Sequence, residues 1–535
     1  MDGETNSADM EPSAKRLKTT NGMHEGDGNG VATNDVLQRV EEGDDKLREF
    51  VRWCVENENP ITFNDKVFLG KKGSAANYGM TATKVIEVGE VIFRIPQKRL
   101  LSWQNLPNAV TLRADVEKMA VSNRWTPTIL AVMLESSNPA SPWAPYLDLF
   151  LRRNSLDVPL LWETPALATL TAGLNVADRV KRDKAQITSD FAAWIFPALK
   201  KYKGVDQSLY ETLLEEAHRV SAFVMSYSFT RPKEGGHGES DTEEEESDEE
   251  EGQGEATRVG NALAEVPLMI PVADFLNASV SKNNAKLHWA EAEGQEEEGD
   301  LTMISTKAIK AGEEIFNTYG EISNEEMLYL YGYAEDDTEN PHEEVFIPTE
   351  HLKQVATSII QAQNFSITAD EIQTRWEYLQ HRKVVGDEYP IVLGRDGILT
   401  DDDLDVILRV MSMSDQEFVE YTQNDNEDAD QTPQGTYALE NLVQLPDKSK
   451  AVLRGLLERR MADYPRHLVA ERMHLERLRG NLRAREQNED EKKELQREYW
   501  VSCVRQAQLV LLTTYAERVA LPVQHHNYRS DQNPL

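Results

Sequence analysis

The sequence predicts an α+β protein with two structured domains, a β-rich domain with a helical insertion and a helical domain that follows it. Short apolar strand signals occur at 85–96 and again between 266 and 316, on either side of a stretch with helical periodicity. Beyond about residue 345 the helical pattern is nearly continuous, and 453–498 is rich in Leu, Glu and Arg, which favour helices. A chain of 535 residues is too long for one ordinary core, so more than one domain is expected.

The predicted domain boundaries follow shifts in composition. Residues 1–45 are rich in Gly, Asn, Asp, Glu and Ser and are expected to be disordered. The β-rich domain then spans 46–345, with its helical insertion at about 105–230, and the helical domain, expected to be all-α, spans 346–535. The block 231–262 contains a long run of acidic residues that cannot bury surface, so we expect a disordered, solvated loop there.

Local patterns place individual elements within the β-rich domain. The spacing of apolar residues in 46–56 predicts an amphipathic helix that buries one face. That face carries Leu47, Phe50, Val51 and Cys54. Strand signals lie at 266–270, 286–289, 301–304 and 314–316.

The composition excludes several classes of function. The formal charge of −36 argues against direct nucleic-acid binding, which needs clustered Lys and Arg, and favours a basic protein partner; acidity that serves only solubility is the alternative. Two cysteines and scattered histidines provide no metal-site spacing, so no metal is expected. No apolar run is long enough to span a membrane, and the N-terminus has no apolar signal region, so we expect no membrane attachment or secretion.

A short basic cluster stands out in the acidic N-terminal tail. Residues 12–18, Pro-Ser-Ala-Lys-Arg-Leu-Lys, are similar to a one-part nuclear import signal, although such clusters also occur by chance. We therefore expect a nuclear location, with the cytoplasm as a second one.

Four segments carry residues suited to chemistry, and each has an ordinary structural explanation when taken alone. Small-residue turns, tyrosines at strand ends and asparagine caps are common in any fold. The segments are 75–80 (AANYGM), 225–229 (MSYSF), 271–278 (PVADFLNA, followed by NNA at 283–285) and 312–320 (GEEIFNTYG, followed by YGY at 331–333).

In this order and spacing, the four segments resemble the SET-domain methyltransferases, in the subgroup of the Rubisco large-subunit methyltransferase. The motif 141–147, SPWAPYL, resembles the inserted helical region of that subgroup. The resemblance covers about 46–345 and continues weakly through the helical domain, where it implies a substrate-binding role. The closest resemblance is to the branch shared by SET-domain-containing protein 6 and the fungal ribosomal lysine N-methyltransferase 4.

The resemblance implies a protein-lysine N-methyltransferase that uses S-adenosyl-L-methionine, with Tyr319 as its catalytic residue. The residues implied to bind the cofactor are Ala76, Asn77, Tyr78, Tyr227, Asn277, Ala278 and Tyr331. Those implied to bind the substrate are Trp143, Asp274, Tyr331 and Tyr333. For Trp143 a place in the core is an equal alternative, and for Asp274 the alternative is a cap on the following turn.

The chemistry of lysine methylation explains these residue types. A lysine ε-amine, with a pKa near ~10.4 in water, must be neutral to attack a methyl group, and burial among aromatic rings favours the neutral form. Tyr319 is expected to align the reacting groups rather than to act as a base. Tyr331 and Tyr333 would line the lysine channel, and the hydroxyl of Tyr333 suggests that only one methyl group is added.

Three positions depart from the family pattern and leave alternatives open. Asn77 replaces a glycine, Tyr227 an arginine and Ala278 a histidine, so a catalytically idle peptide-binding adaptor remains a candidate. An acidic chaperone for a basic client is another. As an enzyme, we expect the chain to act as a monomer on a large-subunit (60S) ribosomal protein, with a histone or a transcription factor as the alternative substrate.

Overall fold

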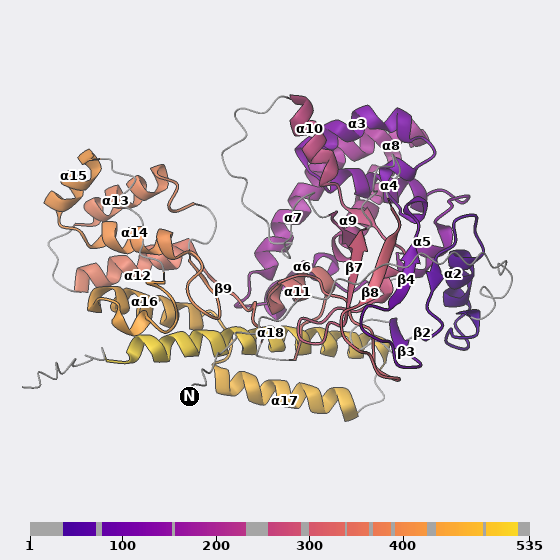
Figure 1. The fold of residues 1–535 in the computed structure, drawn as a ribbon. Coiled ribbons are helices and arrows are strands. Elements are labelled where there is room, and N and C mark those ends of the chain that lie inside the picture. The colour runs from indigo at the N-terminus through magenta and orange to yellow at the C-terminus, as the bar shows by residue number, and fades with distance from the viewer. Residues whose placement is uncertain are drawn as a thin grey trace, which may run out of the picture.

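The protein is described here by a computed structural model, in which a compact β-containing body and a smaller helical body share one long helix (Figure 1). The residues that the structure describes are 36–70, 78–151, 156–231, 255–289, 299–336, 340–362, 368–386, 391–424, 435–484 and 488–522.

The larger body is organised around a four-stranded antiparallel sheet. Its strand order is β1 (Thr62–Phe63), β4 (Val91–Ile95), β8 (Leu301–Ser305) and β7 (Ala285–Trp289). Along β8 every second residue is buried, the alternation expected when one face of a sheet covers a core. Two short antiparallel pairs accompany it, β2 (Val67–Gly70) with β3 (Gly79–Ala82), and β5 (Ser228–Phe229) with β6 (Leu268–Met269).

Helices cover this sheet, and most of them come from the predicted insertion. The first helix, α2 (Asp45–Val55), confirms the amphipathic segment, because Leu47, Phe50, Val51 and Cys54 are all buried. Asp44 caps it by accepting a hydrogen bond from the backbone N–H of Leu47 at 3.0 Å. The insertion consists of α3 (Ala109–Ser122), α4 (Thr126–Ser136), α5 (Ala144–Phe150), α6 (Thr164–Leu170), α7 (Val176–Asp190), α8 (Phe196–Lys203) and α9 (Tyr210–Tyr227).

The C-terminal domain is helical, as predicted, with one small addition. The strands β9 (Val345–Ile347) and β10 (Ile391–Leu393) form an antiparallel pair that was not predicted. Its buried positions join the apolar core of this domain. The helices are α12 (Thr349–Ala362), α13 (Ala369–His381), α14 (Asp401–Ser412), α15 (Asp415–Asn424), α16 (Asp447–Met461), α17 (Leu468–Ala484) and α18 (Glu489–Ala520).

The long helix α18 belongs to both bodies. Figure 1 shows it running beneath them, with α17 alongside its N-terminal part. Its first half contributes Val501 and Val504 to a core shared with Leu328 of α11 (Asn324–Tyr331). Its second half contributes Leu512 and other residues to the core of the C-terminal domain. At 32 residues, and a rise of about 1.5 Å per residue, it is long enough to reach both.

Three local predictions need correction. Disorder was predicted to residue 45, but Val36 and Val40 are each 2% exposed. Their four-residue spacing places both side chains against the apolar core of the larger body. The acidic loop was predicted to reach 262, but Glu255–Ala264 is helix α10, whose Ala262 and Leu263 pack against the same core. The acidic run itself ends before this helix begins.

The third correction concerns the strand predicted at 314–316. Its place is taken by two isolated bridges, Thr81 with Glu314 and Ala278 with Asn317. The neighbouring backbone groups bond to the Asn284 side chain, to strand β3 and to the backbone of 284–285 instead of to one partner strand, so no continuous ladder forms. This irregular backbone is the part of the molecule that carries Tyr319.

Candidate active site

The candidate site lies where two segments far apart in sequence, 272–279 and 314–320, run side by side. The backbone N–H of Asn317 donates to the carbonyl of Asn277 at 2.9 Å, and the N–H of Ser279 donates to the carbonyl of Asn317 at 3.3 Å. These bonds form a parallel bridge between Ala278 and Asn317. The structure therefore brings together two of the motifs that the sequence singled out.

Two amide side chains, one buried and one half-buried, fix this crossing. The side chain of Asn277, in a residue only 5% exposed, donates to Glu314 Oε1 at 2.6 Å and to the carbonyl of Tyr78 at 3.3 Å. Asn284 donates from Nδ2 to the carbonyl of Glu314 at 3.0 Å and accepts at Oδ1 from the N–H of Phe316 at 2.9 Å. Polar groups buried with their partners in place hold a single geometry, because any other arrangement leaves them unpaired.

The segment before Asn277 is strained. Val272 has φ of +81° and is fully buried. A β-branched residue is rarely found in this region of backbone space, and such strain collects at functional sites. The strained residue leads into the short helical turn η7 (Ala273–Phe275), which presents Asp274.

Tyr319 occupies the centre of the site. Its hydroxyl donates to the carbonyl of Leu276 at 3.3 Å, and its ring stacks on Tyr331 with the centroids 4.0 Å apart and the planes 28° apart. Burial, together with the nearby Tyr333, raises the pKa of the Tyr319 phenol well above its ordinary value. The phenol is therefore neutral at physiological pH, which suits alignment rather than proton abstraction.

Tyr331 and Tyr333 flank a glycine that the fold requires. Tyr331 ends α11, and Gly332 caps the helix with φ of +75°. A Cβ at Gly332 would lie 2.0 Å from the carbonyl oxygen of Asp157, so no other residue fits without a shift of the backbone. The chain then turns so that the Tyr333 hydroxyl donates to the carbonyl of Ala278 at 2.9 Å.

Asp274 is buried beside two tyrosines. Its Oδ2 accepts a short hydrogen bond from the hydroxyl of Tyr146, and within the described part of the chain its buried Oδ1 has no hydrogen-bond partner. Burial raises the pKa of the Asp274 carboxyl well above its ordinary value, and burial likewise raises the pKa of Tyr227. This environment favours a neutral carboxyl in the wall of the site over a charged surface contact for a basic peptide.

Trp143 lies in the core rather than at the surface. It is 4% exposed, and its indole N–H donates to the carbonyl of Arg99 at 3.1 Å. A tryptophan with its apolar body buried and its N–H satisfied needs no further partner. The geometry thus favours the alternative that the sequence left open, a core tryptophan.

The remaining predicted cofactor residues divide into two groups. Ala76 and Asn77 lie outside the residues that the structure describes. Tyr78 contributes its carbonyl to Asn277, while its hydroxyl donates to Asp44 Oδ2 at 2.9 Å. The ring of Tyr227 packs against Phe150 and Phe223, with centroids 5.7 and 5.5 Å away.

Sequence reasoning missed four contributors to the site. Tyr146, Glu314, Asn284 and the carbonyl of Leu276 bond directly to predicted site residues or to their segments. The Asn-Asn-Ala signal at 283–285 already marked Asn284 as unusual, but gave it no role. Tyr146 lies in the 141–147 motif, in which only Trp143 was predicted to have a role.

Two other searches of the described residues find nothing further. No group of His, Cys, Asp and Glu within them is arranged to hold a metal ion. No helix among them is long and apolar enough to cross a membrane.

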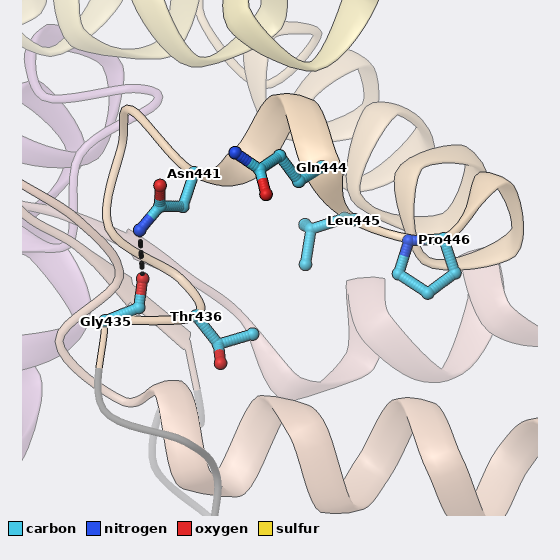
Figure 2. Close-up of a pocket in the computed structure, with 6 residues that line it drawn as sticks. All are labelled: Gly435, Thr436, Asn441, Gln444, Leu445 and Pro446. Atoms are coloured by element: carbon cyan, nitrogen blue, oxygen red, sulfur yellow. Dashed lines mark hydrogen bonds between the residues drawn. The ribbon is translucent and has the colours of Figure 1, made fainter. Parts of the chain in front are cut away.

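An open hollow in the C-terminal domain lies apart from the predicted site. Figure 2 shows it, with the Asn441 amide donating to the carbonyl of Gly435 at 2.8 Å. Its lining residues are Gly435, Thr436, Asn441, Gln444, Leu445 and Pro446.

Comparison with known proteins defines the class to which this fold and site belong. The model of the SET domain family matches residues 77–320, a span that holds both crossing segments and Tyr319. Two solved structures share the fold at 14% sequence identity. The SET domain of LSMT bound to lysine and AdoHcy has a TM-score of 0.55 and covers 90% of this chain and 92% of its own. Rubisco LSMT bound to AdoMet has a TM-score of 0.53 and covers 89% and 91%.

Sequence relatives narrow the class further. The N-lysine methyltransferase setd6 of Salmo salar is 30% identical over 397 residues, covering 74% of this chain and 81% of that protein. The setd6 protein of Xenopus laevis is 28% identical over 426 residues, covering 78% and 87%. The chain belongs to the SET-domain protein-lysine N-methyltransferases, and S-adenosylmethionine is the methyl donor of this family. These matches confirm the predicted family, and the finer placement beside the fungal ribosomal enzyme stays a prediction.

Proposed function

We propose that this chain transfers one methyl group from S-adenosylmethionine to a lysine of a basic protein, and that this protein belongs to the large (60S) ribosomal subunit. The observation that carries the methyl-transfer part is the hydrogen bond from the hydroxyl of the half-buried Tyr319 to the Leu276 carbonyl, with the Tyr331 ring stacked on the Tyr319 ring. The net charge of −36 supports a basic substrate.

The residues present fit the cofactor. When bound, S-adenosylmethionine supplies an electrophilic methyl group on a positively charged sulfonium. Three tyrosines and Asp274 lie close enough to Tyr319 to raise its pKa, and the Leu276 carbonyl accepts a hydrogen bond from its hydroxyl. The surroundings of Tyr319 are therefore rich in oxygen atoms and suit the sulfonium cation. The residues proposed to hold the cofactor are Ala76, Asn77, Tyr78, Tyr227, Asn277, Ala278 and Tyr331.

The side chains of the site perform three tasks in this proposal. The Tyr319 hydroxyl lies where the methyl donor and the lysine amine align. Fixing this alignment lowers the barrier to methyl transfer, because the bound groups lose little further translational and rotational freedom on the way to the transition state. The surrounding rings exclude water and favour the neutral form of the substrate amine. Their faces also stabilise the alkylammonium product through cation–π attraction.

The Tyr333 hydroxyl supports a limit of one methyl group. Its hydrogen bond to the Ala278 carbonyl at 2.9 Å fixes the oxygen at one place in the wall of the site. A fixed hydroxyl takes up space that a methylated amine would need in order to turn for a second transfer.

The cellular setting is part of the proposal. The basic cluster at 12–18 supports import into the nucleus, where we propose that the enzyme acts as a monomer before subunit assembly. Replacing Lys15, Arg16 and Lys18 with Ala should leave a fluorescent fusion in the cytoplasm. A fusion that still collects in the nucleus would remove the support that the cluster provides.

Labelling of a cell extract tests the substrate. The enzyme and labelled S-adenosylmethionine are incubated with an extract of cells that lack the enzyme, and the labelled protein is identified by mass spectrometry. We expect a large-subunit ribosomal protein with monomethyl-lysine, and no labelling by Tyr319→Phe. A histone or a transcription factor as the labelled protein would overturn the ribosomal proposal, and equal labelling by Tyr319→Phe would overturn the assignment of Tyr319.

A second experiment separates enzyme from chaperone. Deleting 235–254 removes the acidic run, keeps the whole of helix α10 and leaves every proposed site residue in place. An enzyme should still methylate its substrate after this deletion, whereas a chaperone whose working surface is the acidic run should lose its client.

A further inference from the structure

A line of aromatic rings connects the candidate catalytic residue to the C-terminal domain. From Tyr319 the stacked ring of Tyr331 leads to Tyr333, with centroids 6.4 Å apart. The ring of Tyr333 meets Trp500 of α18 edge to face, with centroids 6.3 Å apart and planes at 70°. Trp500 in turn contacts the neighbouring Tyr499 at 4.8 Å. A residue of the C-terminal helix therefore stands behind the proposed lysine channel.

The helices α17 and α18 also hold the segment that follows Tyr333. Asp336 accepts from the hydroxyl of Tyr499 at 2.7 Å and from Arg479 of α17 at 2.6 Å. Ala334, two residues before Asp336, is 1% exposed and lies in the core that contains Val501. The stretch 333–336 thus takes its position from the C-terminal helices.

On its other side the same stretch is tied to the crossing at the site. Glu335 accepts from the N–H of Val280 at 2.8 Å, and its own N–H donates to Asn324 Oδ1 at 2.9 Å. Together with the bond from Tyr333 to Ala278, these contacts place the Tyr333 ring between the crossing and Trp500. Trp500 is half-buried, so it is an indole face at the margin of the site rather than a deep core residue.

We propose that Trp500 is a positioning residue of the lysine channel. By backing the Tyr333 ring it keeps the Tyr333 hydroxyl on the Ala278 carbonyl, and this placement restricts the enzyme to one methyl group. The inference rests on the proposed function. It gives the C-terminal helix a part in product specificity, in addition to any docking of substrate.

Replacing the indole tests this role. Trp500→Ala removes the support behind Tyr333, whereas Trp500→Phe keeps a ring there. Val504→Ala, one turn further along α18 and fully buried in the same core, controls for general loss of stability. The probe is the set of large-subunit ribosomal proteins from cells that lack the enzyme, with the product methylation state determined by mass spectrometry.

We expect the ratio of dimethyl- to monomethyl-lysine to rise by about tenfold or more in Trp500→Ala, the discrimination that one methyl-sized group provides in a pocket. Trp500→Phe and Val504→Ala should both keep the wild-type ratio. An unchanged ratio in a folded Trp500→Ala enzyme, or an equal rise in Val504→Ala, would overturn the inference.

A second measurement makes the outcome independent of the substrate. Calorimetric titration with free lysine and with free dimethyl-lysine, in the presence of S-adenosylhomocysteine, compares how the channel accepts each side chain. The wild type should prefer lysine, and Trp500→Ala should lose that preference. If the wild-type enzyme labels no ribosomal protein, the proposed substrate fails, and this titration alone decides the role of Trp500: a preference for lysine retained in Trp500→Ala overturns it.

Discussion

The crossing around Tyr319 and the C-terminal helical domain obtain their order in opposite ways. At the crossing the backbone is irregular, and single hydrogen bonds from Asn277 and Asn284 hold it. In the C-terminal domain regular helices bury side chains such as Leu404, Leu453 and Leu512, each fully excluded from solvent. Specific polar bonds define one geometry, whereas apolar packing contributes most of the free energy.

This difference predicts whether a substitution in each region should affect stability or chemistry. A lost apolar group in the helical domain should lower stability and leave the chemistry of the folded enzyme intact. A lost polar group at the crossing should disturb chemistry more than stability. The helix α18 joins the two regions, because its first half packs against α11, the helix that follows the crossing, and its second half packs in the helical core.

The largest effect on stability is expected in the helical core. Leu512→Ala leaves a cavity among fully buried neighbours and should lower the free energy of unfolding by about 2–5 kcal/mol. Urea unfolding measures this loss, and kcat per folded molecule should stay at the wild-type value. A parallel loss of kcat would show that the two regions are not separable.

The largest effect on chemistry is expected at Tyr319. Tyr319→Phe keeps the ring stacked on Tyr331 and removes only the hydroxyl, so kcat should fall by about 10²-fold or more through lost alignment. The free energy of unfolding should fall by no more than about 1 kcal/mol, because a single hydrogen bond is removed. Steady-state kinetics and urea unfolding on the same preparation test both halves of this prediction.

An intermediate effect is expected at Asn277. Asn277→Ala leaves the Tyr78 carbonyl and the Glu314 carboxylate without their amide partner, which should cost about 1–3 kcal/mol of stability. The KM for S-adenosylmethionine should rise as well, because the crossing loses its fixed geometry.

A matched asparagine in the other region is the control for Asn277. Asn441 also donates its amide to a backbone carbonyl, that of Gly435 in the hollow of the C-terminal domain (Figure 2). Asn441→Ala should lower stability and leave the KM unchanged. Equal effects of the two substitutions on the KM would remove the distinction between the regions.

A pH dependence of stability is expected at Glu343, between the two regions in sequence. Glu343 is buried and accepts from Asn324 Nδ2 at 2.8 Å, and burial raises the pKa of its carboxyl to about 8. Because the pKa in the folded state lies above that of the unfolded chain, the stabilisation is complete below about pH 4.5. It is then lost as the pH rises towards 8.

Replacing Glu343 with Gln removes this titration while keeping an oxygen that accepts from Asn324. Glu343→Gln should therefore match the wild type at pH 5 and exceed its melting temperature at pH 8. Thermal melts across this range test the prediction, and identical slopes in the two proteins would contradict it.

Much of the fold was predictable because its signals are local. The helix Asp45–Val55 was evident from apolar spacing, and β7 and β8 appeared where strand signals were placed. The predicted strand at 314–316 failed for a non-local reason. Its backbone groups bond to Asn284, to β3 and to the 277–279 segment, and this combination replaces a ladder.

Sequence motifs marked the candidate site residues but not their partners. The motifs marked Tyr319, Asn277 and Ala278, and the structure brings these three together. Trp143 remained ambiguous, because the sequence does not say whether a tryptophan finds a carbonyl inside the core, as this one does at Arg99. Tyr146 lay in the 141–147 motif without a predicted role, and Trp500 lay in no motif, because the importance of both residues comes from what they contact.

The sequence by itself determined the family and the division into a β-rich part and a helical part, and it marked Tyr319 as the candidate catalytic residue, because periodicity and motif are properties of neighbouring positions. Only the tertiary structure decided which groups surround that residue. It buried Asp274 against Tyr146, set Tyr333 on the Ala278 carbonyl and placed Trp500 of the last helix behind it. Contacts between such distant positions arise only when apolar residues far apart in sequence pack into common cores, and no local pattern encodes that packing.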